Sequence, residues 1–416
     1  MAVAEGGGID PPGAIDAARV GRIFREEWGR SVAALIRVLG DIDLAEDAVQ
    51  EAFAIALRRW PSEGLPPNPG GWITTTARNG AIDRLRRESR GRDLLADLAL
   101  LAPRDDEVGT TEEEGPVDDD RLRLIFTCCH PALSGEAQVT LTLRLLGGLS
   151  TEEVARGFLV AEPTMAKRLV RAKRKIKAAR IPYRVPADHD LPRRLSPVLA
   201  VIYLIYTAGL GRADEPLLCV EAIRLARTLS VLMPDEPEVA GLLALLLLTE
   251  SRRPARLRVD GSLAVLTDQD RRLWDRELIQ EGQAIVRRCL RRNQPGPNQL
   301  QAAINAVHAD AATFEETDWS QIVALYGQLL ELAPTPVVAL NRAIAIGELD
   351  GPASALELLG ELELDGYQPF HAARADLLQR LGRAEEAASE YQRAAALAPT
   401  DAERDFLSRG GRAGRR

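Results

Sequence analysis

The segment from Leu149 to Ala179 constrains the fold of this chain more than any other, because it predicts two helices joined by a short turn. Ser150 and Glu153 have the spacing of a capping box, in which side chains at the start of a helix satisfy its first free N–H groups. After a turn at residues 159–161, Pro163 predicts the start of a second helix, since proline is tolerated at the first helical position.

The second of these helices has one apolar and one basic face. Apolar positions at helical spacing predict a buried stripe made of Met165, Leu169, Ala172 and Ile176. The opposite face carries Lys167, Val170, Arg171 and Arg174, with further cations at its sides (Arg168, Lys173, Lys175 and Lys177). Two short helices, of which the second is basic on its outward face, predict a helix-turn-helix, whose second helix enters the major groove of DNA.

The charge of the whole chain decides between two interpretations of this basic face. The first is a solvated helix on an ordinary helical hairpin, and the second is a DNA-reading helix. The net charge of −8 excludes a general affinity for nucleic acid, so any such affinity has to be local. A strongly basic face on an otherwise acidic protein needs an anionic partner, which favours DNA.

Composition favours an all-α fold, because aromatic residues make up only 4% of the chain while Ala, Leu, Arg and Glu abound. The four cysteines are scattered except for one adjacent pair, which is no disulfide framework and suits a reducing cytoplasm. The amino terminus lacks the layout of a signal peptide. The most apolar run, Val239 to Leu248, is too short to cross a bilayer. We therefore expect a soluble, cytoplasmic protein with no membrane partner.

The organisation of the chain is predicted from shifts in composition and periodicity. We expect a disordered lead and two small helical domains joined by an acidic linker, followed by a helical extension and a set of helical repeats. The predicted ranges are 1–14 for the lead, 15–92 for the first domain, 93–120 for the linker, 121–185 for the second domain, 186–292 for the extension and 293–416 for the repeats.

Three helices are predicted in the first domain. Apolar spacing predicts a first helix that ends at Gly40, and Asp43 with Glu46 is predicted to cap the second. Pro69 is predicted to start a third helix that becomes strongly basic toward Arg92. The predicted inward positions of the second helix are Leu44, Val49, Phe53, Leu57 and Trp60.

The acidic linker separates the two small domains in this prediction. Residues 105–120 contain nine acidic residues and no basic one, and such runs of like charge usually stay disordered. The third helix of the first domain and the helix-turn-helix are therefore predicted to lie on separate domains joined by a tether.

The carboxyl-terminal segment has the spacing of tetratricopeptide (TPR) repeats. The late positions of one repeat are matched by Gly382, Ala387, Tyr391, Ala394 and Pro399. Two or three repeats are rarely stable by themselves, so this segment is expected to pack against the helices that precede it.

Neither a metal site nor a catalytic site is predicted from the sequence. Cys128, Cys129 and His130 suggest a zinc site, but adjacent cysteines on a helix cannot easily face one tetrahedral ion, and no second pair lies nearby. Packing of small thiols is the favoured interpretation. No nucleophile elbow, phosphate loop or HExxH spacing occurs, so we expect no enzyme activity, no metal and no cofactor.

Taken together, these stretches resemble a known family. DLAEDAVQEAFAIALRRW, then GGWITTTARNGAIDRLRR, then a basic helix-turn-helix are similar to bacterial σ70-type initiation factors of the extracytoplasmic-function (ECF) group. The resemblance covers residues 20–179. The carboxyl half, from LPRRLSPVLAVIYLIYTAGL to LDGYQPFHAARADLLQRLGR, resembles one ECF subgroup with a long helical extension.

The resemblance implies the roles of residues in the first domain, which would be sigma region 2. Core RNA polymerase would dock on the exposed acidic face formed by Asp47, Gln50 and Glu51. The −10 promoter element would be opened and held by Trp72, Arg78, Asn79, Arg84, Arg86 and Arg87. Aromatic side chains can stack on an extruded base while arginines hold phosphates. Trp72 lies at a helix start and is equally compatible with the core, and Asp83 is expected to orient arginines, since carboxylates repel phosphate.

The resemblance also implies roles for the second domain, sigma region 4, and for the linker. The −35 element would be contacted by Thr164, Lys167, Arg168, Arg171 and Arg174. The sequence departs from many relatives in having Ala166 and Val170 on the reading face. Apolar side chains there can meet thymine methyl groups but cannot read guanine. The acidic linker would follow the path of the transcript through the polymerase.

Two functional hypotheses of different class follow. The first is a nucleoid-associated sigma factor that binds core RNA polymerase and promoter DNA and promotes melting, with a regulatory extension. The second is a helix-turn-helix transcriptional regulator with a TPR-like interaction domain, which does not replace the housekeeping sigma factor. The extension would bind a protein or small ligand, control the two DNA-binding domains, or only stabilise the chain.

Overall fold

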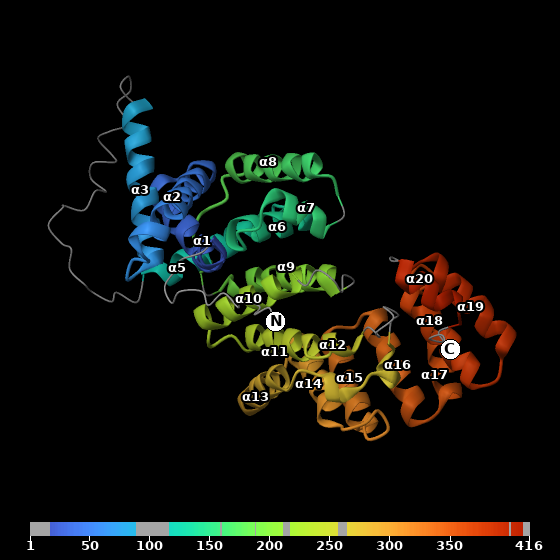
Figure 1. Ribbon diagram of the computed structural model, residues 1–416. Coiled ribbons are helices and arrows are strands. Elements are labelled where there is room, and N and C mark those ends of the chain that lie inside the picture. The colour runs from blue at the N-terminus through green and yellow to red at the C-terminus, as the bar shows by residue number, and fades with distance from the viewer. Residues whose placement is uncertain are drawn as a thin grey trace, which may run out of the picture. The chain divides into compact units, whose positions relative to one another are not determined.

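The structure is a computed structural model that describes residues 17–88, 116–158, 160–187, 189–210, 217–256, 264–398 and 401–410. Every secondary-structure element in these ranges is a helix, so the predicted all-α fold is confirmed (Figure 1). The predicted lead, most of the predicted linker, Arg92 and Pro399 lie outside the described residues. The chain divides into two compact units, residues 1–204 and 205–416.

The first bundle of unit 1 consists of α1 (Ala17–Leu39), α2 (Ile42–Glu63) and α3 (Pro69–Glu88), which pack against one another. Phe24 lies between Trp28 and Phe53, with ring centroids 4.9 and 4.7 Å away. The predicted inward face of α2 is confirmed at Val49, Phe53 and Trp60 but wrong at Leu57, which is 48% exposed.

The start of α2 differs from the prediction. The cap is Asp41, whose carboxylate accepts hydrogen bonds from the N–H groups of Asp43 and Leu44 at 2.9 and 3.1 Å. Asp43 lies within the first turn, because the helix begins at Ile42. The carboxylates of Asp43 and Glu46 are therefore available for other partners.

The second bundle of unit 1 contains the predicted helix-turn-helix. It consists of α5 (Pro116–Cys128), α6 (Gly135–Leu141), the π-helical turn η1 (Thr142–Leu146), α7 (Thr151–Gly157) and α8 (Glu162–Ala178). The capping box is confirmed, because Ser150 accepts from Glu153 N–H at 3.1 Å and the Glu153 carboxylate accepts from Ser150 N–H at 2.7 Å. The apolar stripe of α8 is also confirmed as buried.

The two predicted small domains are in direct contact within unit 1. Helix α1 of the first bundle packs directly against α5 and η1 of the second. Helix α5 begins at Pro116, inside the segment predicted to be linker, and Asp120 on it is fully buried. A buried carboxylate needs cations, and Arg37 and Arg123 supply them at 2.9 and 2.8 Å.

Unit 1 also extends beyond the predicted boundary at residue 185. It includes the first part of α9 (Leu191–Leu210), up to residue 204. Arg194 on α9 donates a hydrogen bond to the Phe126 carbonyl at 2.8 Å, and Leu195 and Val198 are buried. These contacts explain why the start of α9 belongs to unit 1.

Unit 2 is a stack of helices. After the last turns of α9 it contains α10 (Leu217–Leu232), α11 (Pro237–Glu250), α12 (Arg253–Arg256), the 3₁₀ turns η2 (Leu266–Asp268) and η3 (Arg271–Leu273), α13 (Arg276–Arg292), α14 (Pro297–Asp310), α15 (Trp319–Leu332), α16 (Pro336–Leu349), α17 (Pro352–Leu359), α18 (Gln368–Arg380), α19 (Ala384–Ala396) and α20 (Asp401–Ser408). The apolar run of α11 is buried between α10, α13 and α14. Within the described ranges, no helix is long and apolar enough to span a membrane.

The predicted repeat positions lie on a helix pair. Helices α18 and α19 pack against each other, and the buried residues Ala387, Tyr391 and Ala394 of α19 face this contact. The Tyr391 hydroxyl lies 3.1 Å from the Gln379 side-chain oxygen of α18. Two successive helices in contact are compatible with a TPR-like unit, which stays a prediction.

Candidate nucleic-acid interface

The basic face of α8 is presented to solvent. The exposed residues of this face are Lys167, Val170, Arg171 and Arg174. The opposite face of α8, its buried stripe, packs against the rest of the bundle. Among the residues that the structure describes, no carboxylate lies within ion-pair distance of Lys167, Arg171 or Arg174. Thr164 is exposed in the first turn of the helix. The predicted −35 residues therefore form one face with cations free to meet an anion.

A basic groove lies beside this face. It has a volume of about 420 Å³ and runs between α8 and the segment that precedes and starts α6. Its cations are Arg168, Arg171 and Lys175, and Arg168 is also 3.8 Å from Glu136. Because of these three cations, the groove is better suited to the phosphate backbone of a duplex than to an apolar ligand.

Two tryptophans, Trp60 of α2 and Trp72 of α3, contact each other near the start of α3. Trp72 is half-buried and its ring meets the ring of Trp60 edge-on, with centroids 5.4 Å apart and an interplanar angle of 62°. Trp60 is 2% exposed and belongs to the core. The ring of Trp72 is thus positioned by a core residue, and the −10 role of Trp72 stays a prediction.

The remaining predicted −10 residues follow Trp72 along α3. Asn79, Arg84 and Arg86 are exposed, and Arg78 is half-buried. The side chain of Arg87 lies outside the described residues. Asp83 is 3.8 Å from Arg86, in line with the expectation that this carboxylate orients an arginine.

The predicted polymerase-binding face of α2 adjoins the α3 face. Asp47, Gln50 and Glu51 are exposed, and Asp47 lies 3.7 Å from Arg84 of α3. Leu57 continues the same exposed side of α2. The spacing of Leu57 fits the buried stripe of α2, so an exposed apolar residue beside the acidic ones was not predicted.

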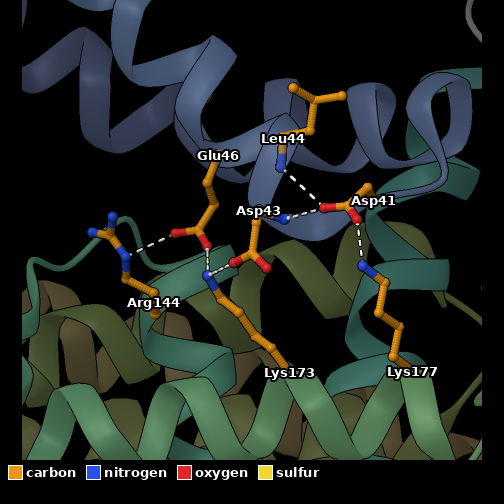
Figure 2. A network of polar contacts seen from close by, with 7 residues as sticks. All are labelled: Asp41, Asp43, Leu44, Glu46, Arg144, Lys173 and Lys177. Atoms are coloured by element: carbon orange, nitrogen blue, oxygen red, sulfur yellow. Dashed lines mark hydrogen bonds and ion pairs between the residues drawn. The ribbon is translucent and has the colours of Figure 1, made fainter.

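A network of charges joins the start of α2 to the second bundle, as Figure 2 shows. Lys173 of α8 lies 2.7 Å from Asp43 and also contacts Glu46, and Lys177 lies 2.7 Å from Asp41. Glu46 is 3% exposed and is also held by Arg144 at 2.8 Å. Sequence reasoning missed this network, because nothing in the spacing of these residues indicates which distant charges they meet.

The network changes the proton affinities of its members. Burial alone would lower the pKa of Lys173, but Glu46 and Asp43 outweigh it and raise the pKa above the ordinary value of lysine. Burial alone would raise the pKa of Asp41, but hydrogen bonds from Lys177 and the Leu44 N–H outweigh it and lower the pKa. Both groups are therefore charged at neutral pH.

The cysteine pair lies in the core of the second bundle. Burial raises the pKa of Cys129 to about 12 and that of Cys128 well above the ordinary value, so both are protonated thiols at neutral pH. The Nδ1 atom of His130 accepts a hydrogen bond from Ala132 N–H at 3.1 Å. Within the described ranges, no group of three His, Cys, Asp or Glu residues is arranged to hold a metal ion.

Comparison with protein families gives three matches along the chain. Residues 25–91 match Sigma-70 region 2, residues 123–176 match Sigma-70 region 4, and residues 194–290 match a family of unknown function, DUF6596. The first two matches cover the two bundles of unit 1. A chain that carries region 2 followed by region 4 has the domain pair of a sigma factor.

Individual relatives place the chain more narrowly. It is 30% identical over 145 residues to the ECF RNA polymerase sigma factor SigL of Mycobacterium tuberculosis, which is 34% of this chain and 77% of that protein. It is 27% identical over 168 residues to SigK of Mycobacterium bovis, another ECF RNA polymerase sigma factor (39% of this chain, 86% of that protein). The chain belongs to the ECF RNA polymerase sigma factors.

The match to one further relative includes the extension. An uncharacterised protein of Rhizobium meliloti (strain 1021) is 44% identical over 388 residues, which is 91% of this chain and 92% of that protein. The two small bundles and the carboxyl-terminal helices therefore occur together in both chains. No solved structure matches the chain.

Proposed function

We propose that this sigma factor binds core RNA polymerase through the exposed side of α2 and recognises two promoter elements with separate bundles. The contact with polymerase is made by Asp47, Gln50 and Glu51, with Leu57 as its apolar component. An acidic rim around an exposed leucine suits a partner with a basic surface and an apolar patch.

In this proposal, α3 opens the −10 element. Trp72 stacks on an extruded base, and Arg78, Asn79, Arg84, Arg86 and Arg87 hold the strand. The support is the half-buried Trp72, whose ring packs on Trp60, at the start of a helix whose exposed side is basic.

Helix α8 contacts the −35 element in the same proposal, with Thr164, Lys167, Arg168, Arg171 and Arg174 facing the DNA. The observation that carries the proposal is the exposed face of α8, whose Lys167, Arg171 and Arg174 have no carboxylate partner among the described residues. Unpaired cations on one side of a rigid helix are the arrangement that phosphate and guanine contacts require. In this proposal the core enzyme carries out polymerisation and this chain catalyses no reaction.

Transcription in vitro with purified core polymerase tests the proposal. The full chain, added as the only initiation factor to a library of promoter-containing fragments, is expected to give transcripts with defined starts. A helix-turn-helix regulator that does not replace the housekeeping sigma factor would give none under these conditions. Absence of both polymerase binding and defined transcripts would overturn the proposal.

We also propose that the carboxyl-terminal helices have a regulatory role, as an interaction surface for a protein or a small ligand. The support is the TPR-like pair α18 and α19, since stacked helix pairs build extended concave binding surfaces. Substitutions on exposed positions of α19, such as Arg393→Glu, are expected to change promoter output in cells while leaving in vitro initiation by the purified chain intact. Equal output in cells would contradict this role.

A further inference from the structure

We propose that α13, α14 and α15 form a docking site for an acidic segment of a partner protein that carries one large apolar side chain. The site consists of a small uncharged cavity, two exposed leucines beside it and three exposed arginines of α13. It involves neither helix of the TPR-like pair α18 and α19. The site gives the regulatory role that we propose for the extension a place and a partner, but its binding test does not depend on that role.

The cavity lies among four helices of unit 2. Helix α14 packs against α11, α13 and α15 (Figure 1), and residues of all four helices line a cavity of about 190 Å³. Its apolar wall is formed by Val286, Leu300, Ala303 and Leu325. This volume is below the roughly 300–1,000 Å³ of pockets that enclose a drug-sized ligand, so the cavity is better suited to one inserted side chain.

No charged residue lines the cavity, although charged residues make up 27% of the chain. The polar side chains of its lining are amides and one thiol, from Asn293, Gln294, Gln299, Gln328 and Cys289. A charge that is removed from water needs a partner of opposite sign, and this lining supplies none. The group that enters the cavity is therefore uncharged. The exposed amides of Asn293, Gln294 and Gln328 can both donate to and accept from the peptide groups of a bound segment.

Two exposed leucines lie on the helices that line the cavity. Leu290 of α13 is part of the lining and is 64% exposed. Leu332 of α15 is 50% exposed and follows the lining residue Gln328 by four positions, which places both on the same side of the helix. Single exposed leucines are common on protein surfaces, but two on the helices of one uncharged cavity extend its apolar surface.

Three arginines of α13 lie beside Leu290. Arg287, Arg288 and Arg291 are exposed, and in the part of the chain that the structure describes none of them has a carboxylate within ion-pair distance. Arg287 precedes Leu290 by three positions, so the two side chains are neighbours on the helix surface. The ion pairs that α13 forms within the described ranges use other residues, Glu281 with Arg227 and Arg292 with Asp235.

Stabilisation of α13 itself does not account for these arginines. Cations stabilise a helix at its carboxyl end, but this effect is confined to the last turn. Helix α13 ends at Arg292, so Arg287 and Arg288 lie before its last turn. Exposed arginines without an ion-pair partner repel one another, and an acidic partner relieves this repulsion when it binds.

The combination of charge and apolar surface indicates the kind of partner. A nucleic acid meets arginines through its phosphates, but its backbone has no group that fills an apolar cavity or covers Leu290 and Leu332. Arginines beside a pocket that takes an apolar anchor are typical of protein–protein interfaces. An acidic protein segment with one large apolar side chain therefore matches both components of the site.

Selection from a library of short random peptides displayed on phage tests the site. The full-length chain is immobilised, and the enriched peptides are sequenced. We expect them to share acidic residues around one large apolar residue and to bind less tightly as salt rises, because salt screens exposed charge pairs. Enriched peptides without this pattern, or the absence of enrichment, would overturn the proposal.

Two variants with matched controls show where the selected peptides bind, since the basic face of α8 can also attract acidic peptides. Arg287→Glu combined with Arg291→Glu reverses the charge beside the cavity, and Leu290→Ser removes an exposed apolar side chain. Each variant is expected to lower the affinity for the selected peptides by about tenfold or more. Unchanged affinity in either variant would overturn the site.

The controls make the same changes at exposed positions of unit 2 outside the site. Arg276→Glu combined with Arg409→Glu matches the charge reversal, and Val231→Ser, at a valine that is 71% exposed, matches the loss of the leucine. Both controls are expected to bind the selected peptides like the unchanged chain. An equal loss of affinity in a variant and its control would also overturn the site.

The other class of partner, nucleic acid, is measured with the same proteins. Binding of the free chain to duplex DNA is expected to be equal in the unchanged chain and in the variant with both Arg287→Glu and Arg291→Glu. Weaker DNA binding by this variant, with unchanged peptide binding, would assign the arginines to phosphates and overturn the proposal. Initiation in vitro is expected to be unchanged in these variants. If even the unchanged chain fails to initiate, the proposed function fails, and the peptide affinities still decide on the docking site.

Discussion

His308 illustrates how burial controls a single ionisable residue in unit 2. Its ring meets Trp319 edge-on, with centroids 5.3 Å apart, and the cations Arg252 and Arg271 lie nearby. Burial, together with repulsion from these two arginines, lowers the pKa of His308 to about 3. The residue is therefore neutral in the folded protein across the whole physiological range.

This gives a prediction for the pH dependence of stability. The unfolded chain binds a proton at His308 near pH 6.5 and the folded chain only near pH 3, so the free energy of unfolding falls as the pH decreases through this window. His308→Phe keeps the contact with Trp319 and removes the titration. Between pH 7 and pH 5, unfolding by urea is expected to show that the variant loses about 2 kcal/mol less stability than the unchanged protein. His189→Gln, at an exposed position, is the control, and an equal loss in His308→Phe and the unchanged protein would contradict the prediction.

At the residue scale, helical periodicity predicted which side chains are buried or exposed better than it predicted which residues they contact. The buried stripe of α8 and the exposed Asp47, Gln50 and Glu51 lie where helical periodicity predicts them. Leu57 and Asp43 do not lie where they were predicted. Periodicity places Leu57 near the buried side of its helix but cannot show that no neighbouring helix covers it. The cap of α2 is two residues earlier than predicted, because the helix begins at Ile42. Proton affinities such as that of His308 depend on distant charges and were not predicted at all.

Helix α7 shows how much one local motif contributes at the scale of an element. It has only seven residues, and both arms of its capping box are formed. A helix this short has little intrinsic stability, so its cap determines how firmly it supports α8. Ser150→Ala is expected to lower the free energy of unfolding by about 1 kcal/mol in a urea titration. Ser62→Ala, in a helix without a capping role, should change it little, and equal effects of the two variants would contradict the assignment.

Helix α8 provides the main prediction for DNA binding. Lys167→Ala and Arg171→Ala are each expected to weaken promoter binding by about 1–3 kcal/mol if the side chain contacts a base. The measurement is competition binding of promoter DNA by the holoenzyme formed with each variant. Arg156→Ala, on the preceding helix, provides the control. A double variant that binds promoter DNA as tightly as the unchanged protein would remove these residues from the −35 contact.

Among the elements, the helix-turn-helix was predictable because its caps and stripe are local in sequence. The start of α5 was not, because a run of acidic residues predicts disorder, whereas Asp120 is stabilised by Arg37, more than eighty positions away. Along the chain, the boundary between the two units falls inside α9. A boundary within a continuous helix leaves no break in the sequence pattern.

The whole molecule combines a net charge of −8 with a locally basic face on α8, the face that we propose contacts promoter DNA. Promoter binding is expected to weaken steeply as salt rises, because each phosphate contact releases a counterion and contributes about −0.9 to the slope of log K against log salt. Lys167→Ala combined with Arg171→Ala should reduce the magnitude of this slope by about 2 if both residues hold phosphate. A titration of holoenzyme binding between 50 and 300 mM salt, roughly the range over which such slopes are resolved, measures it. An unchanged slope would show that neither residue meets a phosphate.

The packing of the two bundles is the feature that sequence analysis could least foresee. The acidic linker suggested independent domains, yet Trp28, Gly29 and Arg144 join them in one unit. Each of these residues has an unremarkable position in its own helix, and their contact depends on a fit between two surfaces that lie more than a hundred positions apart.

The absence of a side chain at Gly29 has a consequence for related proteins. Inside α1, alanine would favour the helix over glycine by about 1 kcal/mol, so glycine here is a disadvantage for the helix by itself. The position is compatible with the packed arrangement only while it stays bare. Homologues that carry any larger residue there should pack their two bundles differently at this point, with the Leu146 backbone displaced from the helix.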